Sequence, residues 1–177
     1  MTTKLEQKRW FAMRATYSQE LKSQKILEQL NIESFVPLIY KVVNKGGKKI
    51  KILAPTLNNY IFIRGTAKDI YEAKTRISYL RYIMDYSNNK IIVPDEQMQN
   101  FIRVASVNDN RSIYFTPDEI NFKQKTRIRV LGGPFDGVEG VFIKIEGKRN
   151  KRLFVAIDNL LAIAAIVDPE LIELLEE

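Results

Sequence analysis

Apolar and polar positions change period several times along the first part of the chain, which predicts strands and helices in alternation. An unbroken apolar run at 10–13 predicts a buried strand, and helical spacing follows over 19–30. Ser18 precedes that helix and is a suitable N-cap. A second apolar strand is expected at 35–39, where Pro37 suits a strand end.

The next segment combines basic charge with glycine. Residues 41–51 hold five lysines and the pair Gly46-Gly47 but no acid, which predicts a flexible basic hairpin tip. The strand expected at 50–53 returns from this tip. Residues 57–63 then alternate, with Tyr60 on one face and Ile61 on the other, so both faces of this strand are apolar.

Two more helices are expected before residue 106. Thr66 is a candidate cap for the first, whose inward positions are Ile70, Ala73, Ile77 and Leu80. Asp95 is a candidate cap for the second, whose inward positions are Met98, Phe101, Ile102 and Ala105. A short hairpin is expected between them, at 82–86 and 90–93. The first domain is therefore predicted to be α+β, an antiparallel sheet with flanking helices.

The pattern changes after residue 105. Apolar periodicity fades between 106 and 117, as in a linker, and short alternating strands follow. Their apolar faces consist of Ile128 and Val130; Val141, Ile143 and Ile145; Leu153, Val155 and Ile157; and Leu161, Ile163 and Ala165. Such spacing predicts a small all-β barrel. The expected division is a first domain over 1–105, a linker over 106–120 and a barrel over 121–177 ending in a short helix.

Composition favours binding over catalysis. The 177 residues are 45% hydrophobic and 28% charged, as in a soluble globular protein. Cysteine and histidine are absent, which removes disulfides, thiolate nucleophiles and most metal sites, so we expect no enzyme and no cofactor or metal. The net charge of +7 suits a polyanionic or acidic partner. No signal peptide or membrane span is evident, so a cytoplasmic location and no membrane partner are expected.

One glycine-rich stretch carries a specific motif. Residues 129–141 give a basic and apolar strand, a tight turn and a glycine where the next strand must bend. The motif positions are Gly133, Pro134, Phe135, Gly137 and Gly140. This stretch resembles the KOW motif, which occurs in ribosomal proteins as well as in transcription elongation factors. The alternative is an arbitrary hairpin with several glycines.

The first domain narrows this choice. Four stretches resemble, in order, the N-terminal domain of NusG transcription factors: Arg9-Trp10-Phe11, Ser18-Gln19-Glu20, 32–37 and 55–63. Together with the KOW-like stretch the resemblance spans about residues 8–169. The basic run at 147–152 is most similar to the UpxY branch, the antiterminators of capsular polysaccharide operons.

The resemblance implies a surface for RNA polymerase. NusG-like N-terminal domains dock an apolar sheet surface on the clamp helices of the polymerase. The corresponding residues here are Leu57, Tyr60 and Phe62, with Trp10 and Phe35 in support. The alternative is that some of them are ordinary core residues. Where the family usually has Phe-Pro-Gly-Tyr, this chain has Leu57-Asn58-Asn59-Tyr60, which leaves the turn geometry open.

Two basic patches are candidate nucleic-acid contacts. The first lies at the lysine-rich tip, with Lys45, Lys48 and Lys49, where the family's loop lies close to upstream DNA. The second is Lys148, Arg149, Lys151 and Arg152, at a hairpin tip of the barrel. Each would add salt-dependent phosphate contacts to DNA or nascent RNA. The alternative for both is a solvated loop.

A turn in the second domain bears on mechanism. Housekeeping NusG proteins carry an Ile-Phe-Gly turn that contacts the termination factor Rho or a ribosomal protein, and this chain has Ile157-Asp158-Asn159. A carboxylate in place of the aromatic removes apolar contact and adds a charge to desolvate, so Rho binding is not expected. The leading hypothesis is a monomeric, operon-specific antiterminator. The alternatives are a general NusG factor that couples polymerase to Rho or ribosomes, and a KOW-based RNA-binding protein of ribosome assembly.

Overall fold

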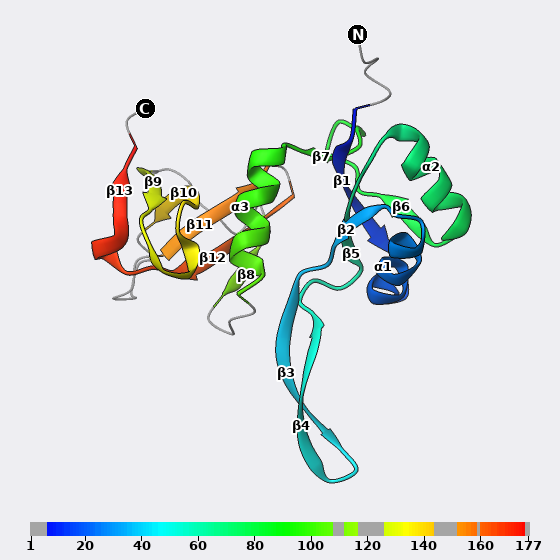
Figure 1. The fold of residues 1–177 in the computed structure, drawn as a ribbon, viewed down its shortest axis with the longest axis horizontal. Helices are drawn as coiled ribbons and strands as arrows, with labels where there is room; N and C mark the ends of the chain where they lie inside the picture. Colours follow the sequence, from blue (N-terminus) through cyan, green and yellow to red (C-terminus); the bar gives the residue numbers. More distant parts are fainter. Residues whose placement is uncertain (1–6, 108–111, 117–125, 144–151, 159, 176–177) are drawn as a thin grey trace. The chain divides into compact units, whose positions relative to one another are not determined.

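The computed structural model describes residues 7–107, 112–116, 126–143, 152–158 and 160–175. They form two compact units, which divide between Asp95 and Glu96. The strands pair antiparallel and helices accompany them, so the α+β class predicted from the sequence is confirmed (Figure 1). None of the helices in the described part of the chain is long and apolar enough to cross a lipid bilayer.

A five-stranded antiparallel sheet forms the centre of the first unit. Its members are β1 (Arg9–Ala15), β2 (Glu33–Phe35), β5 (Tyr60–Gly65), β6 (Leu80–Tyr82) and β7 (Ile92–Val93). The order is β2-β5-β1-β6, with β7 also paired to β1. The apolar strands predicted around residues 10–13 and 57–63 are confirmed as β1 and β5. The structure shows that they are neighbours, paired from Arg9 with Gly65 to Arg14 with Tyr60.

Two helices cover one face of this sheet. They are α1 (Glu20–Gln29) and α2 (Ala67–Arg76), and they pack on inward residues of β1 and β5. Thr66 caps α2 as predicted: its side chain accepts a hydrogen bond from the Asp69 N–H, while the Asp69 carboxylate accepts one from the Thr66 N–H. The cap predicted for α1 is wrong, because Gln19 holds that position and makes no side-chain cap.

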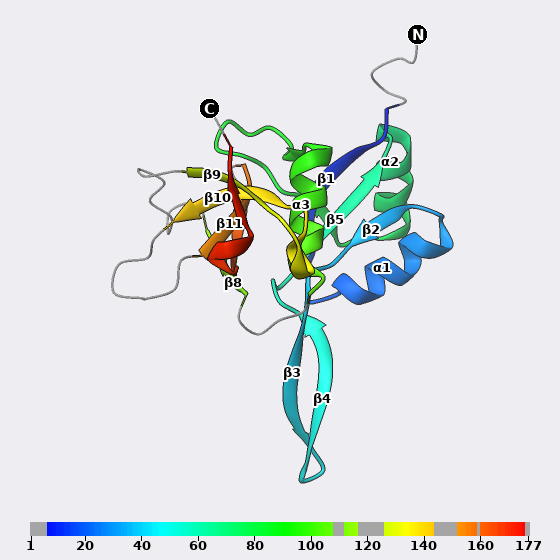
Figure 2. The same cartoon turned by 60° about the vertical axis from the view of Figure 1, so that its left-hand side comes forward.

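A separate two-stranded ribbon extends from the first unit (Figures 1 and 2). It consists of β3 (Leu38–Lys45) and β4 (Lys48–Pro55), joined by Gly46-Gly47. The strand predicted over 35–39 is instead broken at Val36-Pro37, and its halves belong to different sheets. The basic hairpin predicted over 41–51 is confirmed, and all of its lysines lie in paired strands.

Both glycines at the ribbon turn have positive φ, 59° at Gly46 and 77° at Gly47. A two-residue hairpin turn with this backbone matches the right-handed twist of its strands, and few residues other than glycine adopt it readily. The Gly-Gly pair therefore fixes the register of the ribbon.

The second unit contains α3 (Asp95–Ala105), whose first residue ends the first unit, and a six-stranded antiparallel sheet. The sheet runs in the order β13-β9-β10-β11-β12-β8. The strands are β8 (Ile113–Phe115), β9 (Thr126–Val130), β10 (Glu139–Ile143), β11 (Arg152–Ile157), β12 (Leu161–Ile166) and β13 (Ile172–Leu174), with two short 3-10 helices, η2 (Gly133–Phe135) and η3 (Pro169–Leu171). The four strands predicted from alternating apolar residues are confirmed as β9 to β12.

Several short elements differ from expectation. Residues 113–115, inside the expected linker, form β8 and pair with β12. The short C-terminal helix is limited to η3, and β13 follows it. The hairpin expected at 82–86 and 90–93 is reduced to a bridge between Met84 and Lys90, because β6 and β7 both pair with β1 instead. These segments are three residues long or less, too short for a hydrophobic period to show.

The grouping of α3 also differs from the expected division at residue 105. Met98, Phe101, Val104 and Ala105 are its buried residues, whereas Ile102, expected inward, is half-buried. The ring of Phe101 meets that of Tyr114 on β8, edge to face at 6.3 Å. Side-chain hydrogen bonds from α3 to the second unit, described below, also join the helix to this sheet. The loss of apolar periodicity after residue 105 therefore marks the end of α3 and not a boundary between the units. The contacts of α3 place it in the second unit.

Candidate partner-binding surfaces

The turn before Tyr60 is held by a small network of hydrogen bonds in the first unit. Asn59 has a positive φ of 70°, the backbone that a glycine would supply. Its carbonyl accepts a hydrogen bond from the Ala15 N–H at 2.8 Å, and its side-chain oxygen accepts one from the Ser18 N–H at 2.8 Å. The Asn59 N–H donates to a carboxylate oxygen of Glu20, a residue only 1% exposed. Asn59 therefore adopts a backbone that glycine favours, and the turn geometry that the sequence left open is fixed.

Tyr60 follows this turn at the start of β5 and is half-buried. The guanidinium of Arg14, its neighbour on β1, lies 5.7 Å from the centroid of the Tyr60 ring. Leu57, on the other side of the turn, is also half-buried. Both candidate contact residues thus present part of their surface, and Tyr60 does so beside a positive charge.

Two of the other three candidate polymerase residues lie deeper. Phe62 and Trp10 lie on the sheet face opposite α1 and α2, and they are 0% and 5% exposed. Phe35 on β2 is half-buried and pairs with Phe62 in the register of β2 and β5. In this structure, direct contact with a partner is therefore available to Leu57, Tyr60 and Phe35. Trp10 and Phe62 can only support them from within.

The first basic patch occupies the end of the ribbon. Lys45 and Lys48 pair across the Gly46-Gly47 turn, and Lys49 pairs with Asn44. All three lysines are exposed. Cations at the end of a protruding ribbon are accessible to a phosphate backbone.

Of the second basic patch, only Arg152 falls within the described residues. It begins β11, where it pairs with Ile143 and Ile166, and it is only 9% exposed. Lys148, Arg149 and Lys151, like Ile145 of the expected strand and Asn159 of the expected turn, lie outside the described residues. The assignment of this patch to nucleic acid stays a prediction.

The KOW-like stretch forms the turn between β9 and β10. Gly133, Pro134 and Phe135 make the 3-10 helix η2, and Phe135 is buried. A Cβ atom added at Gly140 would lie 2.5 Å from the carbonyl oxygen of Phe154 on β11. The glycine predicted to let β10 bend is therefore also required by the close approach of the next strand.

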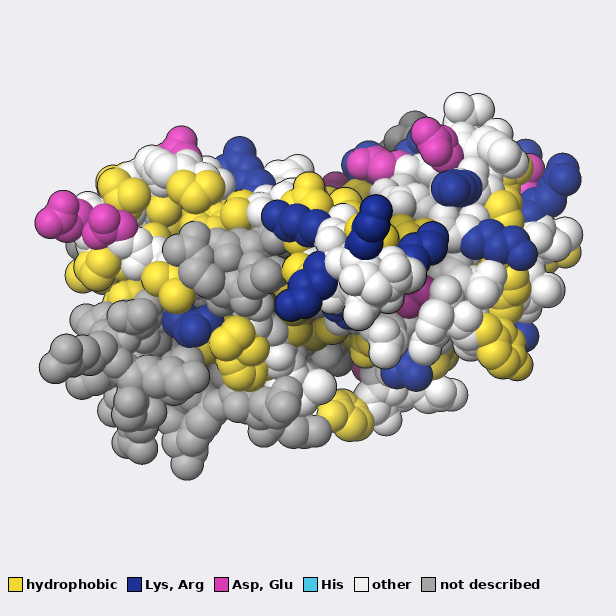
Figure 3. Space-filling model, turned by 90° about the horizontal axis from the view of Figure 1, so that it is seen from below, with side chains coloured by type: hydrophobic (Ala, Val, Ile, Leu, Met, Phe, Trp, Pro, Cys, Tyr) yellow, Lys and Arg dark blue, Asp and Glu magenta, His cyan; other side chains and the backbone are white. Residues whose placement is uncertain are grey.

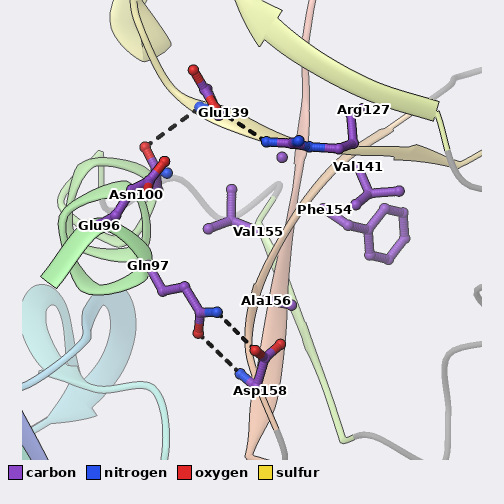
Figure 4. A pocket seen from close by; sticks show the side chains of 11 residues that line it. Glu96, Gln97, Asn100, Arg127, Glu139, Val141, Phe154, Val155, Ala156 and Asp158 are labelled. Atoms are coloured by element: carbon purple, nitrogen blue, oxygen red, sulfur yellow. Dashed lines mark hydrogen bonds and ion pairs between the residues drawn. The ribbon is translucent and has the colours of Figure 1, made fainter. Parts of the chain in front are cut away.

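The turn after β11 is engaged by α3. The Gln97 amide donates a hydrogen bond to the Asp158 carboxylate at 2.8 Å, and the Gln97 side-chain oxygen accepts one from the Asp158 N–H at 3.2 Å (Figure 4). Both polar groups of Asp158 are thus bound by one side chain. The Asp158 side chain is therefore a hydrogen-bonded carboxylate.

Two more polar contacts join α3 to the sheet. The Asn100 side-chain oxygen accepts a long hydrogen bond of 3.4 Å from the Glu139 N–H, and the Arg103 guanidinium donates to the Asp136 carbonyl at 2.6 Å. Glu139 also forms ion pairs with Arg127 at 3.6 Å and Arg129 at 2.6 Å. The hydrogen bond to Glu139 raises the pKa of Arg129, which stays charged at every physiological pH.

A cavity of about 390 Å³ lies between α3 and strands β9 to β11, within the second unit (Figure 4). Its polar lining includes Glu96, Gln97, Asn100, Arg127, Glu139 and Asp158. Arg127 and Glu139 neutralise each other in part, and the Gln97 to Asp158 contacts cross one end. Among the described residues, no group of three acids could hold a metal ion.

Sequence patterns did not predict the contact between Glu20 and Asn59, and they did not single out Arg14 or Gln97. Asparagine at a position where relatives have glycine was the one available signal, because asparagine tolerates left-handed backbone better than other non-glycine residues. Gln97 gave no signal, since its role depends on a turn 61 residues away.

The fold and these surfaces define a two-unit α+β protein whose distinctive features are turns and protruding strands. A family model described as "Transcription termination factor nusG" matches residues 8–102, more than half of the chain. The chain therefore belongs to the NusG family. Members are non-enzymatic transcription elongation and antitermination factors, and they typically bind RNA polymerase.

Solved structures give a weaker likeness. A chain from a study of domain interaction in Thermotoga maritima NusG is 17% identical, with a TM-score of 0.45. The alignment covers 96% of this chain and 98% of that chain. No curated protein matches the sequence.

Proposed function

We propose that this NusG-family protein is an operon-specific antiterminator that binds the clamp helices of RNA polymerase through its first unit and suppresses premature termination. The operon we propose directs polysaccharide biosynthesis, on the resemblance to the UpxY branch. The protein would act in the cytoplasm as a monomer.

The proposed polymerase contact centres on Tyr60. Its position is supported by the Asn59 network, which ties the turn to β1 and to buried Glu20. A rigid turn reduces the conformational entropy lost on binding. Leu57 and Phe35 would add apolar contact, and the ribbon-tip lysines Lys45, Lys48 and Lys49 would add phosphate contacts to DNA or RNA. A ribosomal protein is a further candidate partner for the second unit.

The single observation that carries the specialised role is the engagement of Asp158 by Gln97. A partner that needs an apolar contact at this turn would have to break two hydrogen bonds and desolvate a carboxylate. Rho would therefore bind poorly. Loss of Rho engagement favours elongation over termination.

Binding to polymerase is tested by pull-down with purified polymerase. Tyr60→Ala should lose most of the polymerase that the wild-type protein retains, because it removes the central aromatic contact. Tyr71→Ala is the matched control, since Tyr71 is 75% exposed on α2 and has no proposed role. Equal recovery with both variants would reject the docking assignment.

The antiterminator role is tested in cells. Deletion of the gene should lower promoter-distal transcripts of one long operon while promoter-proximal levels hold, as measured by RNA sequencing. Unchanged distal transcripts in every operon would reject antitermination.

Rho binding separates this role from that of a general factor. Wild-type protein should retain little Rho, and Asp158→Phe should retain more, because the substitution restores an aromatic and removes the charge. Tight binding of Rho by the wild-type protein would favour the general NusG alternative.

A further inference from the structure

The sheet face that carries α1 and α2 is not covered along its whole width. Phe11 and Met13 on β1 belong to the core cluster under the helices. In the antiparallel register, Tyr82 on β6 pairs with Met13, and Ile92 on β7 pairs with Phe11. Residues that pair directly point to one face of a sheet, so Tyr82 and Ile92 lie on the helix side. Ile92 is nevertheless 38% exposed and Tyr82 is half-buried, so the helices leave this part of the face open to solvent.

The segment between β6 and β7 extends this open surface. Met84 and Lys90 form a bridge there. Met84 lies two positions after Tyr82, and Lys90 lies two positions before Ile92, so strand alternation places both on the helix side. The ammonium of Lys90 lies 4.2 Å from the centroid of the Tyr82 ring, which agrees with this placement. Met84 is 42% exposed, so the open surface has an apolar centre.

Three cations lie beside this apolar centre. The ammonium of Lys74 on α2 lies 4.6 Å from the centroid of the Tyr82 ring, which Lys90 also contacts. The guanidinium of Arg9 lies 5.7 Å from the centroid of the Phe11 ring. The Phe11 and Tyr82 ring centroids are 6.0 Å apart, so two neighbouring rings hold all three cations. The β6–β7 patch is the name used below for six residues: Arg9, Lys74, Tyr82, Met84, Lys90 and Ile92.

The cations of the β6–β7 patch form no ion pair with a carboxylate in the part of the chain that the structure describes. Arg9 and Lys74 are nevertheless half-buried, and the Nε atom of Arg9 is buried without a hydrogen-bond acceptor among those residues. Asp85, the acid nearest in sequence, accepts hydrogen bonds from the N–H groups of Ser87 and Asn89 in its own turn. Partly desolvated cations without a counter-ion are stabilised by an anionic partner.

The combination of charge and apolar surface restricts the kind of partner. The end of the ribbon gives a contrast: in a view onto it, Lys and Arg side chains gather around the Gly46-Gly47 turn (Figure 3). A phosphate backbone suits such a purely cationic end, but it offers no apolar surface to Met84 and Ile92. An amphipathic helix with acidic residues beside its apolar stripe offers both kinds of contact. The β6–β7 patch therefore fits an acidic protein segment better than it fits nucleic acid.

We propose that the β6–β7 patch binds an acidic amphipathic helix of another protein. Carboxylates of the helix pair with the three cations, and its apolar side chains pack on Met84 and Ile92. The Tyr82 ring lies against both lysines and limits their movement, so less side-chain entropy is lost on binding. The electrostatic part of the affinity falls as salt rises, and the apolar part remains.

The β6–β7 patch lies on the opposite side of the sheet from the proposed polymerase contact. Phe62 lies on the face opposite α1 and α2, and Tyr60, two positions before it on β5, shares that face. A helix bound to the patch therefore does not compete with Tyr60. The inference adds a partner of its own and does not depend on the proposed function.

The test uses the full chain and a labelled synthetic peptide of about 18 residues, which is long enough to form a helix. The peptide carries leucine along one face and glutamate on both sides of that face. One control peptide has glutamine in place of every glutamate, and a second has serine in place of every leucine. A single-stranded DNA oligonucleotide is the probe for nucleic acid. Fluorescence anisotropy measures binding of each probe at several salt concentrations.

The charge variant of the protein is Lys74→Gln with Lys90→Gln. Its matched control is Lys25→Gln with Lys68→Gln, which removes two exposed lysines from α1 and α2 and changes the net charge equally. Circular dichroism checks folding, and the single substitution Lys90→Gln, at an exposed residue, serves if the double variant is misfolded.

The apolar variant is Met84→Ser with Ile92→Thr, which keeps a β-branched residue in β7. Wild-type protein should bind the leucine and glutamate peptide about tenfold more tightly than either control peptide. The charge variant should bind that peptide about tenfold more weakly than wild type, and with a weaker dependence on salt. The apolar variant should also bind more weakly but keep the salt dependence of wild type. The matched control should bind like wild type.

Three results would overturn the inference. Wild-type protein could bind the leucine and glutamate peptide no better than the control peptides. The charge and apolar variants could bind it as tightly as wild type, which would place the contact elsewhere. Wild type could prefer the oligonucleotide and lose it in the charge variant, which would assign the β6–β7 patch to nucleic acid. The proposed function is tested separately, by the polymerase pull-down with Tyr60→Ala.

Discussion

The five-stranded sheet and the ribbon of the first unit are built from similar residues, but the sheet is buried and the ribbon is exposed to solvent. Ile61, Phe62 and Ile63 on β5 are all 0% exposed, whereas Val42 and Ile50 on the ribbon are 68% and 37% exposed. Both segments are rich in β-branched and aromatic residues. A segment rich in such residues is therefore predicted to be a strand, but its composition does not predict whether the strand lies in the hydrophobic core.

The difference comes from what covers each strand. On the sheet, Ile61 and Ile63 pack against Leu27 of α1 and Ile70 of α2 in one buried cluster. The ribbon forms its own two-stranded sheet and meets that cluster at Leu38, the first residue of β3. Strands that the chain does not cover are available to another molecule.

The largest expected effect is in the sheet. Phe62→Ala should lower the free energy of unfolding by about 3–5 kcal/mol, because it leaves a cavity where the side chain is fully buried. Val42→Ala on the ribbon is the control and should change it by less than about 0.5 kcal/mol. Urea unfolding followed by Trp10 fluorescence measures both, since Trp10 is the only tryptophan and lies on neighbouring β1. A similar destabilisation in both variants would show that the ribbon is as well covered as the sheet.

The sheet of the second unit should also be destabilised by a substitution at a tightly packed position. Gly140→Ala places a methyl group 2.5 Å from the Phe154 carbonyl oxygen, so strands β10 and β11 must shift. We expect a destabilisation of roughly 1–3 kcal/mol, as for other overpacked sites. Leu131→Ala, at a residue 49% exposed, is the control. Hydrogen exchange of β10 and β11 amides should speed up in Gly140→Ala and stay unchanged in the control.

A smaller effect is expected at the ribbon turn. Gly47→Ala puts a side chain on a residue with φ of 77°, which costs roughly 1–2 kcal/mol of local stability. Amides of β3 and β4 should exchange faster with solvent while the unfolding midpoint seen by Trp10 holds. A shift of that midpoint would mean that the ribbon and the sheet unfold together rather than as separate parts.

The smallest effect is expected at the two hydroxyl residues that the sequence predicts as helix N-caps, Ser18 and Thr66. Thr66→Ala removes the capping box of α2 and should cost about 1 kcal/mol. Ser18→Ala should be nearly neutral, because α1 has no side-chain cap. Thermal unfolding of both variants checks this, and equal destabilisation would show that Ser18 acts on α1 after all.

Much of the fold was predictable from local pattern. The strands around Trp10, Tyr60 and Leu153 and all three helices follow from apolar spacing over at least five residues. Elements of two or three residues, such as β7 and β8, were missed because they are too short to show a period. The candidate sites were predictable to the extent that they rest on local motifs: the KOW-like turn and the tip lysines. Contacts between distant residues, such as Gln97 with Asp158, were not.

The sequence by itself determined the α+β class, the glycine turns and the membership of the NusG family, because these depend on residue type and local spacing. Only the tertiary structure decided that Phe62 is buried, that Asn59 has a positive φ, that α3 groups with the second sheet and that Val42 on the ribbon is exposed. Burial depends on which surfaces meet, and the local sequence of a strand does not specify what packs against it.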